Sequence, residues 1–418
     1  MLPITQKPDA ELSFIDAVFL SISAVTVTGL STIDLSQLLS VPGTFIFAVI
    51  LQFGGIGIMT FGVLIWILLR KKIGMQKRIL ITKEQNSFTI SGIVRFVRVI
   101  FLFFVVIELF GTVVLGTYFL KFFPTWQEAY LQGFFASVSA ITNAGFDITG
   151  KSLIPFAKDY FVLTFNMVFY IIGSLGFPVL IEVREWLKHK KKRQFRFSLF
   201  TKITTVTFLL LIVIGTIFIF VIEYNHFYAN KPWHQSFMYS LFYSISSRTG
   251  GMAITDISEF SLPTHLFLCI LMFIGASPSS AGGGIRTTTL AIMLLAMYYY
   301  AKGDKTVKVF KREIVEEDII KSFIVFTTAM LLCSVAVIIL VCIEPAFSLI
   351  EILFEVSSAF GTVGLSLGIT PELSTAGKVV IMMLMFIGKI GIFTFLFFMG
   401  GKTIKHKYHY PKEQVIIG

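Results

Sequence analysis

The chain has 418 residues, of which 55% are hydrophobic and only 14% are charged. Soluble domains normally carry about 25% charged residues, so this composition excludes an ordinary soluble domain and is typical of an integral membrane protein. The net charge is +11, but the basic residues lie in clusters between apolar runs, as the positive-inside rule describes, and we do not expect nucleic acid as a partner.

The apolar runs divide the chain into four units of one plan: an outer span, a short half-crossing helix, a glycine-containing stretch, a second span and a basic loop. Several runs reach the roughly 20 residues that cross a hydrocarbon core. We therefore expect an all-α polytopic membrane protein, with the units repeated around one pore. Unit 1 covers residues 1–78, unit 2 residues 79–199, unit 3 residues 200–314 and unit 4 residues 315–418.

Unit 1 is predicted to hold a short helix at 13–25, the stretch around Gly29 and a second span at 44–69, followed by a basic cluster at 70–78. Its outer span is missing from this sequence. Either the sequence starts downstream of the true start or the protein is a shortened form.

Unit 2 has all its parts. We expect an outer span at 94–123, a short helix at 125–140, the stretch around Gly145 and a second span at 160–183. The basic run at 188–196 then closes the unit. The simplest interpretation of this run is topological, with contact to anionic lipid or to a partner as a second one.

Unit 3 follows the same plan, with an outer span at 203–222, a short helix at 232–247 and the stretch around Gly251. Its second span, at 266–300, is interrupted at 275–289 by Pro and Gly residues, which weaken a regular helix.

Unit 4 closes the chain. It is predicted to hold an outer span at 319–343, a short helix at 347–359, the stretch around Gly364 and a last span at 379–399. A basic tail follows, with Lys402, Lys405 and Lys407. Because every basic cluster follows a second span, all clusters lie on one face, which the charge rule makes cytoplasmic.

Two marks recur in step along the four units. The first is a glycine followed by a large apolar residue, and the intervals between these glycines are 116 (145−29), 106 (251−145) and 113 (364−251). The second lies in the second spans, as FGGIG, IGSLG, IGASP and IGKIG. Intervals of this length are too long for a solenoid, whose repeats are about 20–50 residues long, and they suit a repeated membrane unit.

Irregular backbone inside a membrane is tolerated only when it is buried or lines a water-filled cavity. Four such stretches around one axis would point carbonyl oxygens inward and replace the hydration shell of a monovalent cation. The negative C-terminal ends of the short helices would favour cations further. The stretches hold no acidic side chain, which argues against a divalent site. The alternative is four re-entrant segments that merely pack.

With the motifs TVTGL, TNAGF, RTGGM and GTVGL in this plan, the chain resembles the Trk/Ktr/HKT superfamily of potassium transporters, most closely the bacterial Ktr membrane subunit. The resemblance implies a homodimer in which each chain has its own pore, gated by a cytosolic nucleotide-binding ring. It also implies potassium preference, because each unit has a filter glycine. The implied filter residues are Thr26, Val27, Thr28, Gly29, Thr142, Asn143, Ala144, Gly145, Thr249, Gly250, Gly251, Gly361, Thr362, Val363 and Gly364.

The interruption of unit 3 has two interpretations. The first is a kink that neighbouring helices tolerate. The second, which the resemblance supports, is a flexible loop below the filter that blocks the pore. The residues of this expected gate are Gly275, Ala276, Ser277, Pro278, Ser279, Ser280, Ala281, Gly282, Gly283 and Gly284.

Three charged residues lie within apolar surroundings. Lys389 either forms an electrostatic barrier under the filter or pairs with Glu355; related sequences have an Arg there, so Lys is a departure. Arg248 either turns behind the filter to bond carbonyls or a carboxylate, or sits at the outer rim. Glu108 is expected in a helix–helix hydrogen bond rather than an ion site.

We therefore predict potassium uptake through a multi-pass protein of the plasma membrane, with a cytoplasmic C-terminus and contacts to membrane lipid. The chain is not expected to be an enzyme or to hold a cofactor; potassium is the substrate and sodium a candidate activator. One alternative is a sodium-selective or sodium-coupled transporter of the same fold. The others are a polytopic membrane enzyme and a non-conducting shortened subunit.

Overall fold

The computed structural model describes residues 5–8, 12–57, 93–189, 195–304 and 306–400. Within this part the chain is helical apart from loops and one antiparallel hairpin, β1 (Lys308–Val309) with β2 (Arg312–Glu313), so the all-α expectation is confirmed. The expected basic cluster at 70–78, the C-terminal lysines and the second half of the span at 44–69 lie outside the described residues.

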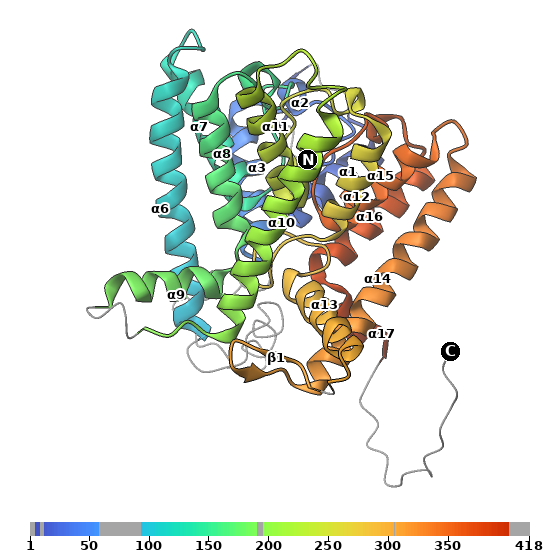
Figure 1. Ribbon diagram of the computed structural model, residues 1–418. Coiled ribbons are helices and arrows are strands. Elements are labelled where there is room, and N and C mark those ends of the chain that lie inside the picture. The colour runs from blue at the N-terminus through green and yellow to red at the C-terminus, as the bar shows by residue number, and fades with distance from the viewer. Residues whose placement is uncertain (1–4, 9–11, 58–92, 190–194, 305, 401–418) are drawn as a thin grey trace.

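Three long helices have the length and hydropathy of membrane spans: α6 (Ile93–Phe119), α10 (Leu199–Glu223) and α14 (Glu316–Ile343). They are the outer helices expected for units 2, 3 and 4. They stand at the outside of the molecule in Figure 1, and each exposes large apolar side chains along one face. Such a face suits contact with lipid chains.

Four short helices lie between the long ones, in the upper half of Figure 1. They are α1 (Phe14–Thr26), α7 (Trp126–Thr142), α11 (Trp233–Ile245) and α15 (Leu349–Gly361). A side-chain cap starts three of them, and Ser348 with Glu351 forms a full capping box at α15. With 13 to 17 residues each, they are too short to cross the layer that α10 crosses with 25 residues, as predicted for half-crossing helices.

The second helix is broken in units 2, 3 and 4, and in unit 1 its described part ends at Ile56. Its upper parts are α3 (Val41–Ile56), α8 (Tyr160–Ser174), α12 (Leu262–Phe273) and α16 (Thr375–Ile390). Its lower parts in units 2, 3 and 4 are α9 (Phe177–Lys188), α13 (Thr287–Ala301) and α17 (Ile392–Gly400).

Two predicted continuous spans are therefore wrong. The span at 160–183 bends by 103° between α8 and α9, and the span at 379–399 breaks between α16 and α17. Gly176 and Gly391 have φ of +92° and +89°, a conformation that ends an α-helix and that side chains disfavour. After its bend, α9 runs nearly crosswise to the other helices in Figure 1.

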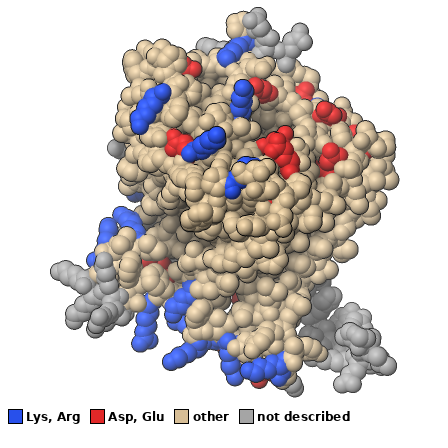
Figure 2. All heavy atoms as spheres, turned by 45° about the horizontal axis from the view of Figure 1, so that its top comes forward, with Lys and Arg blue, Asp and Glu red and all other residues tan. Residues whose placement is uncertain are grey.

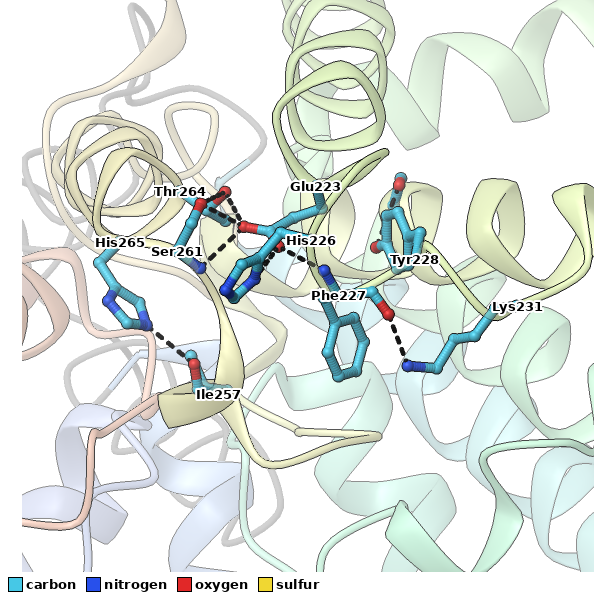
Figure 3. A network of polar contacts seen from close by, with 10 residues as sticks. Glu223, His226, Phe227, Tyr228, Lys231, Ile257, Ser261, Thr264 and His265 are labelled. Carbon is cyan, nitrogen blue, oxygen red and sulfur yellow. Dashed lines mark hydrogen bonds and ion pairs between the residues drawn. The ribbon is translucent and has the colours of Figure 1, made fainter.

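Glutamates at the outer ends of two long helices tie these helices to the second helix of the same unit. Glu223, at the end of α10, accepts from the backbone nitrogen of Ser261 (2.9 Å) and from its hydroxyl (2.6 Å), as Figure 3 shows. Glu344, after α14, likewise accepts from the backbone nitrogen of Ser374 (2.8 Å). Each carboxylate satisfies donors at the start of the second helix of its unit, which is α12 in unit 3 and α16 in unit 4. The helix dipole favours negative charge at this end.

The shorter elements connect these helices. They are the α-helical turn α2 (Leu35–Leu38), the 3₁₀ turns η2 (Ile154–Phe156), η5 (Ile257–Glu259) and η6 (Thr370–Glu372), and the π turn η4 (Ser246–Gly250).

Charge is distributed unevenly between the two ends of the molecule. Lys and Arg side chains gather at the end away from the short helices, which holds α9, α13 and the hairpin (Figures 1 and 2). At the opposite end acidic and basic side chains are mixed. This asymmetry is the one that the positive-inside rule describes.

Candidate functional site

The four predicted glycines meet one another near the centre of the molecule. A Cβ added at Gly29 would lie 3.0 Å from the Cα of Gly145, and one at Gly145 would lie 3.1 Å from the Cα of Gly251. A Cβ at Gly364 would lie 3.0 Å from the Cα of Gly29. One at Gly251 would overlap the carbonyl oxygen of Val363. Stretches more than 100 residues apart in the chain thus form one ring of backbone, which leaves no room for side chains.

The ends of three short helices explain how this ring is built. Val27, Asn143 and Thr362 each follow a helix and have φ between 50° and 56°, which is the left-handed conformation of a helix C-cap. Their backbone nitrogens, and those of the next residues, bond back to the last turn of the helix. The chain therefore turns sharply and presents the following residues to the centre.

Unit 3 reaches the same place by another route. Its short helix α11 continues into a π turn, and Gly251 itself has φ +68° and bonds back to the carbonyl of Ser246 at 3.2 Å. Gly251 lies five positions after Ser246, whereas Gly145 lies six after Ser139 and Gly364 six after Ser358, so this stretch is one residue shorter, and the π turn accommodates the difference. A Cβ at Gly250 would lie 2.9 Å from the ring of Tyr170, so a glycine is needed here for close packing.

Serines of the short helices stabilise the ring from behind. Ser139 donates to the carbonyl of Phe146 (2.6 Å) and Ser246 to that of Met252 (2.7 Å), while Ser358 accepts from the backbone nitrogen of Gly364 (3.1 Å). Each of these serines is close to the glycine in sequence. The sequence analysis did not single them out, although a serine recurs at this place in all four stretches.

The second repeated mark of the sequence has a physical explanation. In units 1, 2 and 4 the first glycine of the mark packs on the carbonyl of the residue four positions before the filter glycine. This contact joins Gly54 to Val25, Gly173 to Ile141, and Gly388 to Phe360. In the same units the last residue of the mark is a glycine with positive φ at the end of the upper helix, Gly57, Gly176 or Gly391, whereas in unit 3 the helix ends at Phe273 and Pro278 lies within the loop.

A cavity of about 240 Å³ lies against Gly29 and Gly145, on the outer side where the short helices begin. Asp34 and Asp147 line it. Both carboxylates accept backbone hydrogen bonds from their own loops, from Ser36 (2.8 Å) and from Thr149 (3.0 Å). An acid-lined hollow beside the ring attracts cations to it.

The predicted gate residues lie directly below the ring and bond to two other units. The backbone nitrogens of Ser277 and Ala281 donate to the carbonyls of Ser174 and Gly173 in unit 2, both at 3.1 Å. That of Gly283 donates to the hydroxyl of Thr362 in unit 4 at 2.7 Å.

The loop from 275 to 286 is thus an ordered, hydrogen-bonded segment between two helices, not a kink within one. A Cβ at Gly282 would overlap the methyl group of Thr249, and one at Gly283 would lie 2.6 Å from the side chain of Thr362. The loop and the ring are therefore in direct contact.

The structure removes one alternative each for Lys389 and Arg248, while the barrier role of Lys389 stays a prediction. Lys389 donates to the carbonyl of Ala281 in the loop, and does not pair with Glu355, which accepts from Ser366 and Thr370. Arg248 is 1% exposed and donates to the carbonyls of Phe208 (3.2 Å) and Gly275 (2.9 Å). The outer-rim interpretation of Arg248 is therefore wrong.

Arg286, which the sequence analysis missed, is a third cation that bonds to carbonyls of the loop, after Lys389 and Arg248. Its guanidinium donates to the carbonyl of Gly282 and, at 3.5 Å, to that of Ser277. Glu108 accepts from the amide of Gln52 on α3, so the expected helix–helix hydrogen bond is confirmed.

The TrkH family, described as cation transport proteins, matches residues 3–403 of this chain. The chain belongs to the TrkH family. Among its relatives, it is 54% identical over 417 residues to the Ktr system potassium uptake protein D of Bacillus subtilis, covering 100% of this chain and 92% of that protein. It is 37% identical to the Ktr system potassium uptake protein B of the same organism, with the same coverage.

A third relative of this TrkH-family chain is the potassium/sodium uptake protein NtpJ of Enterococcus hirae, which is 33% identical over 423 residues, covering 100% of the chain and 92% of that protein. The crystal structure of the potassium transporter TrkH from Vibrio parahaemolyticus superposes with a TM-score of 0.72 at 20% identity, covering 92% of this chain and 78% of that one. The TrkH-like fold and the multi-pass membrane class predicted from the sequence are confirmed. Membership in a transport family decides against the membrane-enzyme alternative.

Proposed function

We propose that this TrkH-family chain takes up potassium across the plasma membrane through a filter of backbone carbonyls around Gly29, Gly145, Gly251 and Gly364. The observation that carries the proposal is the mutual contact of these four glycines, each at the end of a half-crossing helix. Carbonyl oxygens of Ala144 and Val363 lie among them. Neutral oxygens suit a monovalent cation, whose charge they do not overcompensate.

The names of the relatives support potassium as the substrate, because the two Ktr proteins are described as potassium uptake proteins. The driving force for uptake would be the negative interior potential, worth about 2.3 kcal/mol per charge per 100 mV. The pattern GxxxxGK[ST] occurs at Gly145–Ser152, but this segment is the loop that follows α7 and not a turn between a strand and a helix, as a phosphate-binding loop requires. Direct pumping by this chain is therefore a poor explanation.

Sodium is the basis of the second candidate function. NtpJ is described as a potassium/sodium uptake protein, and it is 33% identical to this chain. A sodium-selective or sodium-coupled transporter would use the same fold. A filter with a glycine in each unit supports potassium over sodium by the family pattern.

The loop 275–286 is proposed as the gate of this path. Support comes from its position against Thr249 and Thr362, and from the hydrogen bond that joins Lys389 of α16 to the carbonyl of Ala281. This hydrogen bond would break if the loop moved out of the path. Arg286 bonds to Gly282 within the loop and adds positive charge there. Positive charge below the filter would also oppose cations that reach it.

We further propose a homodimer regulated by a cytosolic nucleotide-binding ring, with a cytoplasmic C-terminus and lipid around the outer helices. The description of two relatives as parts of a Ktr system is consistent with a partner. The basic end of the molecule is suited to a position at the cytoplasmic surface, because anionic lipid headgroups attract it.

The test is uptake into vesicles that hold the purified protein, with potassium or sodium outside and a negative interior potential. We expect uptake of potassium in excess of sodium. Equal uptake, sodium preference, or potassium uptake only when sodium is present would support the second candidate. Uptake of neither ion would overturn both, and would support the non-conducting alternative.

A further inference from the structure

Two of the four stretches are held by a large polar side chain of their own short helix. Tyr243 of α11 and Glu355 of α15 each lie three residues before the serine that backs the ring, Ser246 and Ser358. Both side chains are fully buried. They point to the backbone that follows the filter glycine rather than to the glycine itself.

Tyr243 bonds four times to the segment after Gly251. Its hydroxyl donates to the carbonyl of Thr255 at 3.0 Å and lies 2.8 Å from the Thr255 hydroxyl. It also accepts from the backbone nitrogens of Ile254 (3.3 Å) and Thr255 (3.0 Å). One hydroxyl thereby fixes two consecutive residues of the loop.

Glu355 does the same after Gly364 with different chemistry. Its carboxylate accepts from the hydroxyls of Ser366 (2.8 Å) and Thr370. The Ser366 hydroxyl in turn accepts from the backbone nitrogen of Gly368 at 3.0 Å. A buried carboxylate that lost these donors would be strongly destabilised, so the loop and the carboxylate hold each other in place.

Units 1 and 2 have no polar side chain at this position. The positions three residues before Ser23 and Ser139 hold Leu20 and Ala136, whose side chains carry no polar atom. The loop of unit 2 is held instead by Asp147 within the loop, which accepts from Thr149 and Ser152, and by a longer contact of 3.4 Å from the Gln132 amide to the carbonyl of Ile148. A fully buried brace at this position is thus present in units 3 and 4 and not in units 1 and 2.

We propose that Tyr243 and Glu355 are positioning residues that set ion selectivity by holding the backbone after Gly251 and Gly364. The inference rests on the proposed function, because it needs a filter that discriminates between ions. A ring of carbonyls distinguishes potassium from sodium only while its oxygens keep their spacing and number. Removing either brace lets the stretch that it holds relax toward the smaller ion.

The experiment compares potassium and sodium uptake by purified variants in vesicles. Tyr243→Phe removes only the hydroxyl, and Glu355→Gln keeps the size of the side chain but removes an acceptor and the charge. We expect the potassium-to-sodium ratio to fall about fivefold in each, which corresponds to the net contribution of roughly one hydrogen bond. A merely structural role would lower the amount of folded protein but leave this ratio unchanged.

Matched controls lie one helical turn away on the same helices. Tyr239→Phe removes a buried hydroxyl that accepts from Gln235 at 2.8 Å, and Glu351→Gln changes the capping box at the start of α15. Both should keep the ratio of the unmodified protein. If Glu355→Gln does not fold, the double variant Ser366→Ala with Thr370→Val removes the same bonds from the loop side, and the same fall is expected.

The experiment distinguishes failure of this inference from failure of the proposed function. A selective unmodified protein whose ratio is unchanged by Tyr243→Phe and by the Glu355 variants would overturn this inference alone. An unmodified protein that carries neither ion, or carries both equally, would overturn the proposed function and the inference with it. A fall in the controls as large as in the variants would also overturn the inference, because the effect would then not be specific to the braces.

Discussion

The molecule carries two levels of repeated glycines, and they behave differently. At the upper level, Gly29, Gly145, Gly251 and Gly364 contact one another and form one ring. At the lower level, where the second helices break, units 1, 2 and 4 turn at a single glycine with φ from 89° to 101°, whereas unit 3 has the whole loop 275–286.

The difference shows where fourfold symmetry is required. A ring of carbonyls needs an equivalent contribution from each unit, so the upper level tolerates little variation. Even in unit 3, whose stretch is one residue shorter, a π turn brings Gly251 into the ring. The lower level only has to end each helix. One unit can therefore insert a segment across the axis, and a single loop is enough to obstruct a single path.

The largest effect is expected from a methyl group at the upper level. Gly251→Ala should abolish potassium uptake in vesicles, because its Cβ would overlap the carbonyl oxygen of Val363. Gly303→Ala is the matched control: Gly303 also has positive φ (+83°), but nothing lies within 4 Å of the added Cβ. The control should keep its uptake. Full uptake by Gly251→Ala would show that the ring does not carry the ion.

Removal of the inserted segment should have the next largest effect. Deleting residues 277–283 takes away the backbone that bonds to Ser174, Gly173 and Thr362, and leaves the ring without an obstruction. We expect a leakier protein, with uptake several times that of the unmodified protein in the absence of any partner. Ion flux equal to that of the unmodified protein would contradict the assignment of the loop as a gate.

A smaller change tests one contact between the two levels. Lys389→Ala removes the donor to the carbonyl of Ala281, and should raise flux or sodium leak by less than the deletion does. Lys378→Ala, on the same helix, is the control: its ammonium group pairs with Asp16 at 2.8 Å, remote from the loop. It should lower thermal stability without changing leak. If Lys389→Ala lowered only the amount of expressed protein and left flux and sodium leak unchanged, the role of Lys389 would be structural.

The smallest effect is expected at a simple break of the lower level. Gly391→Ala places a side chain at φ +89°, where nothing lies within 4 Å of the added Cβ, so the cost is only backbone strain of about 1–3 kcal/mol. Its melting temperature should fall by a few degrees, while the potassium-to-sodium ratio stays the same. A changed ratio would mean that the lower level also shapes the filter.

Much of this arrangement could be predicted from the sequence. Apolar length predicted the outer helices, since a helix needs about 20 residues to cross the membrane. The recurrence of a glycine after a short helix predicted which backbone would meet. Glu108 was correctly predicted to make a helix–helix hydrogen bond, because an isolated carboxyl group in an apolar span needs a donor.

What the sequence by itself determined is the local content of each unit: which segments are apolar enough to span, which are too short, and where glycine permits a turn. Only the tertiary structure decided the bend of 103° after α8, the carbonyls that Arg248 and Lys389 reach, and the pairing of Tyr243 and Glu355 with the loops that follow the ring. These depend on which groups lie close together after folding. Helical periodicity and composition do not determine such distances, because the partners are either far apart in the chain or joined by an irregular loop.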